Sequence, residues 1–208
     1  GAAEKVWRDA GIVGGDFPKN YTLALGSIST KPSDMAMFYA ALANGGYQVK
    51  PQYIYKIENK FGEIVYEAKP KMKKIYDSKD VAILTYMLEN AVNYGTGQPA
   101  KVMKDGKLIP MAGKTGTTSD YVSAWFTGYT PTLATVVYVG NDDNKSMGPG
   151  MTGGAAAAPI WKNYMQAVVD LPNYNVGVFE FIDDYITRKD LTTREIDLQV
   201  GLLDRDGV

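Results

Sequence analysis

The 208-residue sequence contains neither cysteine nor histidine. Without cysteine, the chain has no disulfides and no thiol nucleophile. Without histidine, it can build neither a Ser-His-Asp triad nor a His-ligated metal site. A base that works near neutral pH must therefore be a lysine with a lowered pKa, a carboxylate with a raised pKa, or a group from another polypeptide.

The sequence also lacks an excess of one charge and any long apolar run. Its 22 Lys and Arg residues balance 23 Asp and Glu residues, so the charge does not indicate a nucleic-acid partner. No run reaches the roughly 18 apolar residues that a membrane-spanning helix needs. The hydrophobic content of 45% is ordinary for a globular chain, which allows one domain with a sizeable core or part of a larger one.

The periodicity of apolar residues predicts several helices followed by an antiparallel run of strands. Thr30 and Asp77 are the expected N-caps of two of the helices. The helices are expected at 1–10, 31–43, 77–94 and 155–169, and the strands as a hairpin over 52–67, a strand around Lys114, and strands at 124–129 and 133–139. This order predicts the α/β (α+β) class and part of a three-layer α/β/α domain with an antiparallel sheet.

The stretch 113–118, which reads GKTGTT, is the candidate functional strand. Side chains alternate along a strand, so Thr115 and Thr117 share one face and Lys114 points to the other. Gly116 removes a side chain where a ligand backbone can approach closely. A cation, two hydroxyls and bare backbone N–H groups suit a peptide that carries a carboxylate. The alternative is a polar strand end with a bulge glycine.

The sequence around this stretch favours the functional interpretation. The surrounding segments are LALGS at 23–27, GTG at 95–97, AWFTGYTP at 124–131, VVYVGNDD at 136–143, TGG at 152–154 and AAPIW at 157–161. In this order, with Lys-Thr-Gly, they resemble the C-terminal half of the transpeptidase domain of a class A (bifunctional) penicillin-binding protein. The resemblance covers residues 1–169. Residues 170–208 are predicted to form an extended arm on the surface.

The resemblance implies a five-stranded antiparallel sheet between helical layers, and a serine that is acylated by D-Ala-D-Ala stem peptides of peptidoglycan or by β-lactam antibiotics. Lys114 would be catalytic beside that serine, and the backbone N–H of Thr117 would be an oxyanion donor. Thr115 and Thr117 would receive the substrate carboxylate, Gly116 would let the substrate backbone approach, and Thr118 would be a weaker contact. Strand twist or a bulge would have to turn Lys114 toward the cleft. No cofactor or metal is implied.

One departure from the family pattern is large, because the sequence contains no Ser-x-x-Lys and no Ser-x-Asn. Ser27 is followed by a lysine four residues later, at Lys31, which is the wrong spacing. The expected partner is therefore an upstream fragment that carries both motifs. The resemblance also implies an extracytoplasmic location, a membrane anchor outside this chain and an attached glycosyltransferase. The alternatives are a β-lactamase or D,D-carboxypeptidase, and a noncatalytic binding domain on the same fold.

Two further patterns are interpreted as structural. Asp142, Asp143 and Asn144 resemble the start of a calcium loop, but the remaining ligand spacing is missing, so no metal site is predicted. The lysines at 69, 71, 73 and 74 could contact anionic lipid or wall polymer, and a solvated face is the preferred interpretation.

Overall fold

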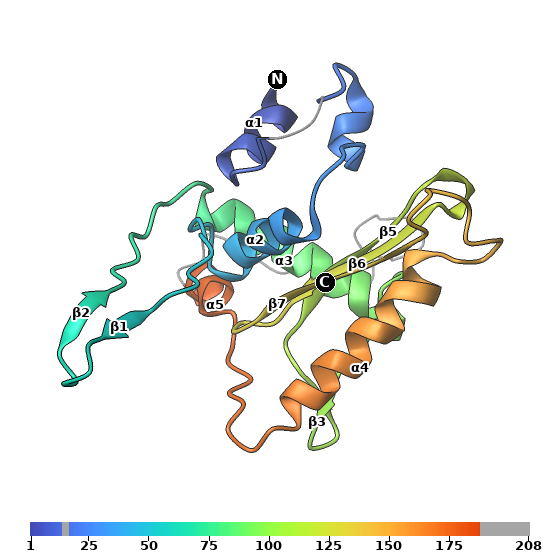
Figure 1. The fold of residues 1–208 in the computed structure, drawn as a ribbon. Coiled ribbons are helices and arrows are strands. Elements are labelled where there is room, and N and C mark those ends of the chain that lie inside the picture. Colours follow the sequence, from blue (N-terminus) through green and yellow to red (C-terminus); the bar gives the residue numbers. More distant parts are fainter. Residues whose placement is uncertain (14–16, 188–208) are drawn as a thin grey trace.

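The computed structural model describes residues 1–13 and 17–187. Its central element is an antiparallel sheet in the order β5-β6-β7 (Figure 1), formed by Ala112–Thr117, Ser123–Tyr129 and Ala134–Gly140. The β5–β6 register runs without a break from Ala112 opposite Tyr129 to Thr117 opposite Ala124. The predicted run of three consecutive antiparallel strands is confirmed.

Helices cover both faces of this sheet (Figure 1). On one face lies α4, Ala158–Val169, preceded by the single π-helical turn η4, Gly153–Ala157. On the other face lie α2, Pro32–Ala43, and α3, Ser78–Asn93. Asp77 caps α3 as predicted, because its side chain accepts a hydrogen bond from the backbone N–H of Lys79. The expected α/β/α layering is confirmed.

Each face of the sheet has its own aromatic core. Under α4, the buried Trp161 packs edge-on against Phe126 with ring centroids 5.2 Å apart, and its indole N–H donates to the carbonyl of Thr135. Under α2 and α3, the buried Tyr129 contacts Tyr39, and its hydroxyl is bonded to Thr85 of α3 at 2.8 Å. Strand β6 supplies a buried side chain to both cores, as expected for the central strand of a layered domain.

The register assigns each side chain of β5 to a face. Residues directly opposite each other on neighbouring strands point the same way. Thr115 lies opposite Phe126 and therefore belongs to the α4 face, whereas Lys114 lies opposite Thr127 and starts on the α2–α3 face. The alternation predicted for the candidate strand is confirmed.

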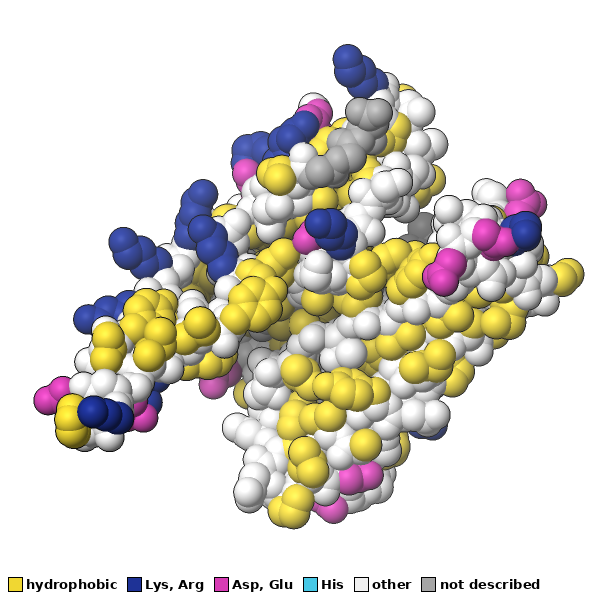
Figure 2. Space-filling view, in the orientation of Figure 1, with side chains coloured by type: hydrophobic (Ala, Val, Ile, Leu, Met, Phe, Trp, Pro, Cys, Tyr) yellow, Lys and Arg dark blue, Asp and Glu magenta, His cyan; other side chains and the backbone are white. Residues whose placement is uncertain are grey.

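The remaining elements are short. They are α1 (Ala2–Asp9), η1 (Tyr21–Leu25), β1 (Lys56–Glu58), β2 (Ile64–Glu67), η2 (Gln98–Ala100), β3 (Met103–Lys104), β4 (Lys107–Leu108), η3 (Ser119–Tyr121) and α5 (Glu180–Thr187). The β1–β2 hairpin projects from the body (Figure 1). Apolar side chains gather on it (Figure 2), and its exposed apolar residues are Ile57, Phe61, Ile64, Val65 and Tyr66. The lysines at 69–74 are exposed, as the solvated-face interpretation predicts. Within the described ranges, no helix is both long and apolar enough to cross a bilayer.

The predicted N-cap of α2 is wrong. The helix begins at Pro32, and its N-cap is Lys31, whose backbone is extended at φ −82° and ψ 146°. Proline suits the first helical position because it needs no N–H partner there, and it forces the preceding residue into an extended conformation. Thr30 consequently lies one residue too early to cap the helix.

The prediction of an extended arm after residue 169 is wrong for one segment of the part that the structure describes. Glu180–Thr187 form the helix α5, which packs beside α3. Phe179 is buried against Tyr129 with ring centroids 5.6 Å apart, and Ile182 follows it at helical spacing. These apolar residues fold the segment onto the core. Residues 188–208 of the arm lie outside the described residues.

Contact between α5 and α3 makes stability depend on pH through Glu89. Burial, together with the negative charge of Asp183, raises the pKa of Glu89 from its ordinary 4.5 to about 7. Between these values the folded chain holds a proton that the unfolded chain has lost. Stability from this group is therefore fully present below pH 4.5 and is lost as the pH rises through 7. We expect the thermal midpoint of the wild type to fall between pH 5 and pH 8, and Glu89→Gln to remove much of that fall.

The control for this experiment is Glu67→Gln, which changes an exposed carboxylate on β2. It should leave the pH dependence of the thermal midpoint as in the wild type. An identical fall in the wild type and in Glu89→Gln would show that Glu89 does not titrate in this range.

Candidate active site at the edge of β5

Lys114 reaches around the free edge of β5. In the described part of the chain, β5 pairs only with β6. The ammonium of Lys114 donates to the carbonyl of Thr115 at 3.0 Å and lies 3.4 Å from the Thr115 hydroxyl. The side chain starts on one face and ends beside a hydroxyl of the other, so it crosses the strand edge. Of the two expected causes, strand twist or a bulge, the bulge is ruled out, because the register is unbroken. The length of the lysine side chain makes the turn instead.

The backbone at this edge is also available to a ligand. The N–H of Thr118 donates to the carbonyl of Ser123 across the β5–β6 ladder. Backbone groups of successive residues alternate between the two edges of a strand. Thr115 and Thr117 therefore present their N–H and carbonyl groups away from β6, and Gly116 between them adds no side chain.

The Thr117 hydroxyl is held by the turn before α4. It accepts a hydrogen bond from the N–H of Gly153 at 3.0 Å. A Cβ on Gly153 would lie 2.3 Å from the carbonyl oxygen of Trp125, so only glycine allows the turn to approach the strand this closely. A hydroxyl has one donor and two acceptor sites. With the backbone N–H on one acceptor site, the exposed Thr117 keeps its proton free to donate.

The Thr115 hydroxyl has a partner that the sequence interpretation did not assign to the site. The hydroxyl of Thr96 lies 2.6 Å from it. The motif at 95–97 indicated only a helix end and a family likeness. The sequence signal that could have placed Thr96 in the site is its position between Gly95 and Gly97. A loop with two glycines can bring the hydroxyl between them close to a neighbouring backbone.

Thr118 and Trp125 have mainly structural surroundings. The Thr118 hydroxyl accepts from the N–H of Ser123 at 2.8 Å and closes the turn between β5 and β6. Trp125 packs against Tyr138 with ring centroids 4.8 Å apart. Of the predicted site residues, the structure therefore brings Lys114, Thr115, Gly116 and Thr117 together at one edge and engages Thr118 in the turn.

One acidic residue of the loop after β7 forms an ion pair with a lysine. The carboxylate of Asp143 pairs with the ammonium of Lys145 at 2.6 Å. The hydrogen bond from Lys145 lowers the pKa of Asp143. No cluster of three or more Asp and Glu side chains that could hold a metal occurs in residues 1–13 and 17–187.

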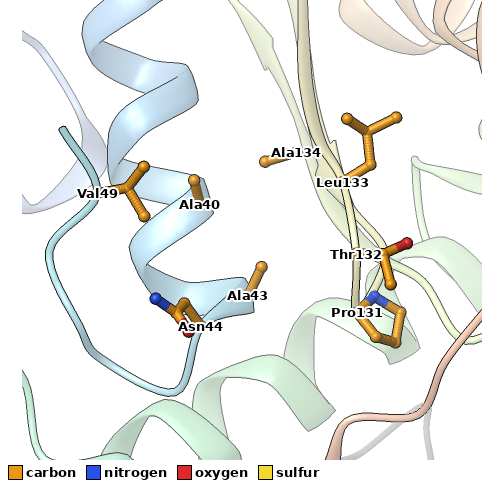
Figure 3. A pocket seen from close by; sticks show the side chains of 8 residues that line it. All are labelled: Ala40, Ala43, Asn44, Val49, Pro131, Thr132, Leu133 and Ala134. Carbon is orange, nitrogen blue, oxygen red and sulfur yellow. The ribbon is translucent and has the colours of Figure 1, made fainter. Parts of the chain in front are cut away.

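A partly open hollow lies at the other end of the sheet (Figure 3). Its volume is about 270 Å³, and it separates the end of α2 from the β6–β7 turn. It is lined by Ala40, Ala43, Asn44, Val49, Pro131, Thr132, Leu133 and Ala134. None of these side chains is charged or nucleophilic enough for acyl transfer. The chemistry-bearing residues lie at the open edge of β5 instead.

The fold and this strand edge define a class of protein. The profile of the penicillin-binding protein transpeptidase domain matches residues 13–166, and the chain belongs to this family. It is similar to penicillin-binding protein 1A of Aquifex aeolicus, with 38% identity over 154 residues that cover 74% of this chain and 21% of that protein. The protein of the same name from Neisseria gonorrhoeae is 34% identical over 171 residues, covering 80% of this chain and 21% of its own length. The chain thus spans only a small part of these relatives.

Solved structures support the same assignment. The crystal structure of penicillin-binding protein 1A from Haemophilus influenzae matches with a TM-score of 0.75 and 25% identity, covering 96% of this chain and 34% of that one. PonA1 of Mycobacterium tuberculosis, solved in complex with penicillin V, matches with a TM-score of 0.69 and 25% identity, covering 84% of this chain and 51% of that one. The predicted family and fold class are confirmed.

Proposed function

We propose that this chain forms the substrate-binding wall of a peptidoglycan cross-linking D,D-transpeptidase. In this reaction a serine takes the acyl group of a D-Ala-D-Ala stem peptide, and an amine of a neighbouring stem then accepts it. β-Lactam antibiotics acylate the same serine. The observation that carries the proposal is the edge of β5, where the Lys114 ammonium, two threonine hydroxyls and free backbone groups converge.

Each group at the edge has a role in this proposal. The ammonium of Lys114 stabilises negative charge that develops near the serine, and the N–H of Thr117 donates to the oxyanion. The hydroxyls of Thr115 and Thr117 bind the terminal carboxylate of the substrate. Gly116 leaves room for the substrate backbone to align with β5 as an added strand.

The serine has to come from residues outside this sequence, which contains no Ser-x-x-Lys. An exposed apolar stripe on α3 supports the docking of such a segment. Ile83, Met87 and Tyr94 recur on one side of this helix and its end, with 44%, 62% and 65% of their surfaces exposed. Tyr94 is two residues from Thr96, which contacts Thr115. A half-domain packed on this stripe would therefore lie beside Lys114.

The half-domain that carries the serine would also determine where the protein lies in the cell. It would connect this chain to a membrane anchor and hold the domain on the extracytoplasmic face, where peptidoglycan is assembled. A glycosyltransferase domain on the same polypeptide is part of this proposal, since the relatives are much longer than the chain.

Fluorescent penicillin tests the function in the assembled domain, which is this chain together with the half that carries Ser-x-x-Lys. A stable acyl adduct would support the transpeptidase. Rapid release of the label would indicate a β-lactamase instead. An absence of labelling in a folded assembly would indicate a noncatalytic binding domain.

The division of labour between the two halves gives a separate prediction. These 208 residues alone should form no adduct with penicillin and should tend to aggregate, because the apolar stripe on α3 is exposed and no strand of the described residues pairs with the outer edges of β5 and β7. Mixing with the upstream half should give a stable complex that is acylated on the other chain. Intact-mass spectrometry after incubation decides between the outcomes, and a penicilloyl group on any serine of this chain would refute the proposal.

A further inference from the structure

Thr96 is held beside β5 by close backbone packing on both sides. The loop leaves α3 sharply, with the N–H of Gly97 donating to the carbonyl of Ala91. A Cβ on Gly95 would lie 2.8 Å from the same carbonyl oxygen, so a larger residue would push the loop away. On the other side, a Cβ on Gly154 would lie 2.9 Å from the carbonyl oxygen of Thr96. These contacts fix the threonine between the end of α3 and the turn before α4.

The hydrogen bonds of Thr115 determine where its proton can point. The ammonium of Lys114 can only donate, so the Thr115 oxygen accepts from it at 3.4 Å. The contact with the Thr96 hydroxyl is 2.6 Å, and either group can donate there. If Thr115 donated to Thr96, it would have no proton left for a ligand. If Thr96 donates, both acceptor sites of Thr115 are filled and its proton is free for a carboxylate.

We infer that Thr96 is a positioning residue for recognition of the substrate carboxylate, an inference that rests on the proposed function. Its hydroxyl donates to Thr115 and directs the Thr115 proton outward, while the N–H of Gly153 does the same for Thr117. A carboxylate accepts from both threonines, and its charge strengthens the chain of hydrogen bonds that leads back to Thr96. Thr96 does not itself contact the substrate in this arrangement.

The test is Thr96→Val in the assembled domain, with acylation measured for a carboxylate-bearing β-lactam and for its methyl ester. Valine keeps the shape of threonine and removes the hydroxyl. Loss of one neutral hydrogen bond should slow acylation by the carboxylate compound about three- to tenfold and leave the ester nearly unchanged. Thr96→Ser, which restores the hydroxyl, should recover the wild-type rate.

A double-mutant cycle separates positioning from an independent role. If Thr96 acts through Thr115, then Thr96→Val should cost nothing further in a Thr115→Val background. Thr132→Val is the matched control, because it removes a hydroxyl bonded to Tyr174 at the other end of the sheet. The control should leave the ratio between the two compounds as in the wild type.

Several outcomes would overturn the inference. Unchanged acylation in Thr96→Val, an equal loss for both compounds, or additive losses in the double mutant would show that the Thr96–Thr115 bond is structural or irrelevant. These results would leave the proposed function intact. Failure of the folded wild-type assembly to be acylated would refute the proposed function itself.

Discussion

Replacing Lys114 with alanine in the assembled domain is expected to slow acylation by β-lactams by at least 10²–10³-fold. The ammonium places a positive charge at the edge of β5, 3.0 Å from the carbonyl of Thr115. Removing one preorganised group that stabilises developing charge typically costs about 3–4 kcal/mol. Stopped-flow measurement of the acylation rate provides the test.

The fold should survive this substitution. Lys114 is exposed and belongs to neither aromatic core, so its loss leaves the packing of the sheet intact. Lys107→Ala, at an exposed position on β4, is the matched control and should acylate at the wild-type rate. Wild-type acylation kinetics in Lys114→Ala would rule out the catalytic assignment of this lysine.

Replacing Thr115 and Thr117 together with valine is expected to weaken acylation by carboxylate-bearing β-lactams strongly. Valine keeps the shape of both side chains and removes two hydroxyl donors. Each hydrogen bond to a charged group contributes roughly 1.5–3 kcal/mol, although two neighbouring losses need not add. An ester analogue, which lacks the charge, should lose much less. Acylation rates of both compounds with wild type and double mutant provide the measurement.

The contrast between the two compounds is what identifies the threonines as carboxylate ligands. Equal losses for the acid and the ester would instead show that the two hydroxyls maintain the strand. That outcome has a physical basis, because Thr117 also accepts from the N–H of Gly153 and its loss could displace the turn before α4. Thermal unfolding of the double mutant would reveal such a displacement as a lowered midpoint.

Local signals were sufficient for most of the fold. The cap at Asp77, the apolar period of α3 and the short β6–β7 connection depend on neighbouring residues only, so they predicted the corresponding elements. The failures have local causes as well. Pro32 moved the start of α2 by fixing the backbone of Lys31. Within the predicted arm, Glu180–Thr187 form the helix α5, because the preceding Phe179 packs against Tyr129, far away in the sequence.

The sequence by itself determined the chemistry that this chain can offer. The absence of cysteine and histidine, the missing Ser-x-x-Lys, and the alternation of Lys114 with Thr115 and Thr117 follow from residue identity and from the period of a strand. Only the tertiary structure decided how these groups meet. Lys114 can cross the outer edge of β5 because no strand of the described residues pairs with that edge. Thr96 and Gly153 reach the hydroxyls of Thr115 and Thr117 from separate loops. Such contacts depend on how segments far apart in the sequence pack together, and a local sequence pattern does not determine that packing.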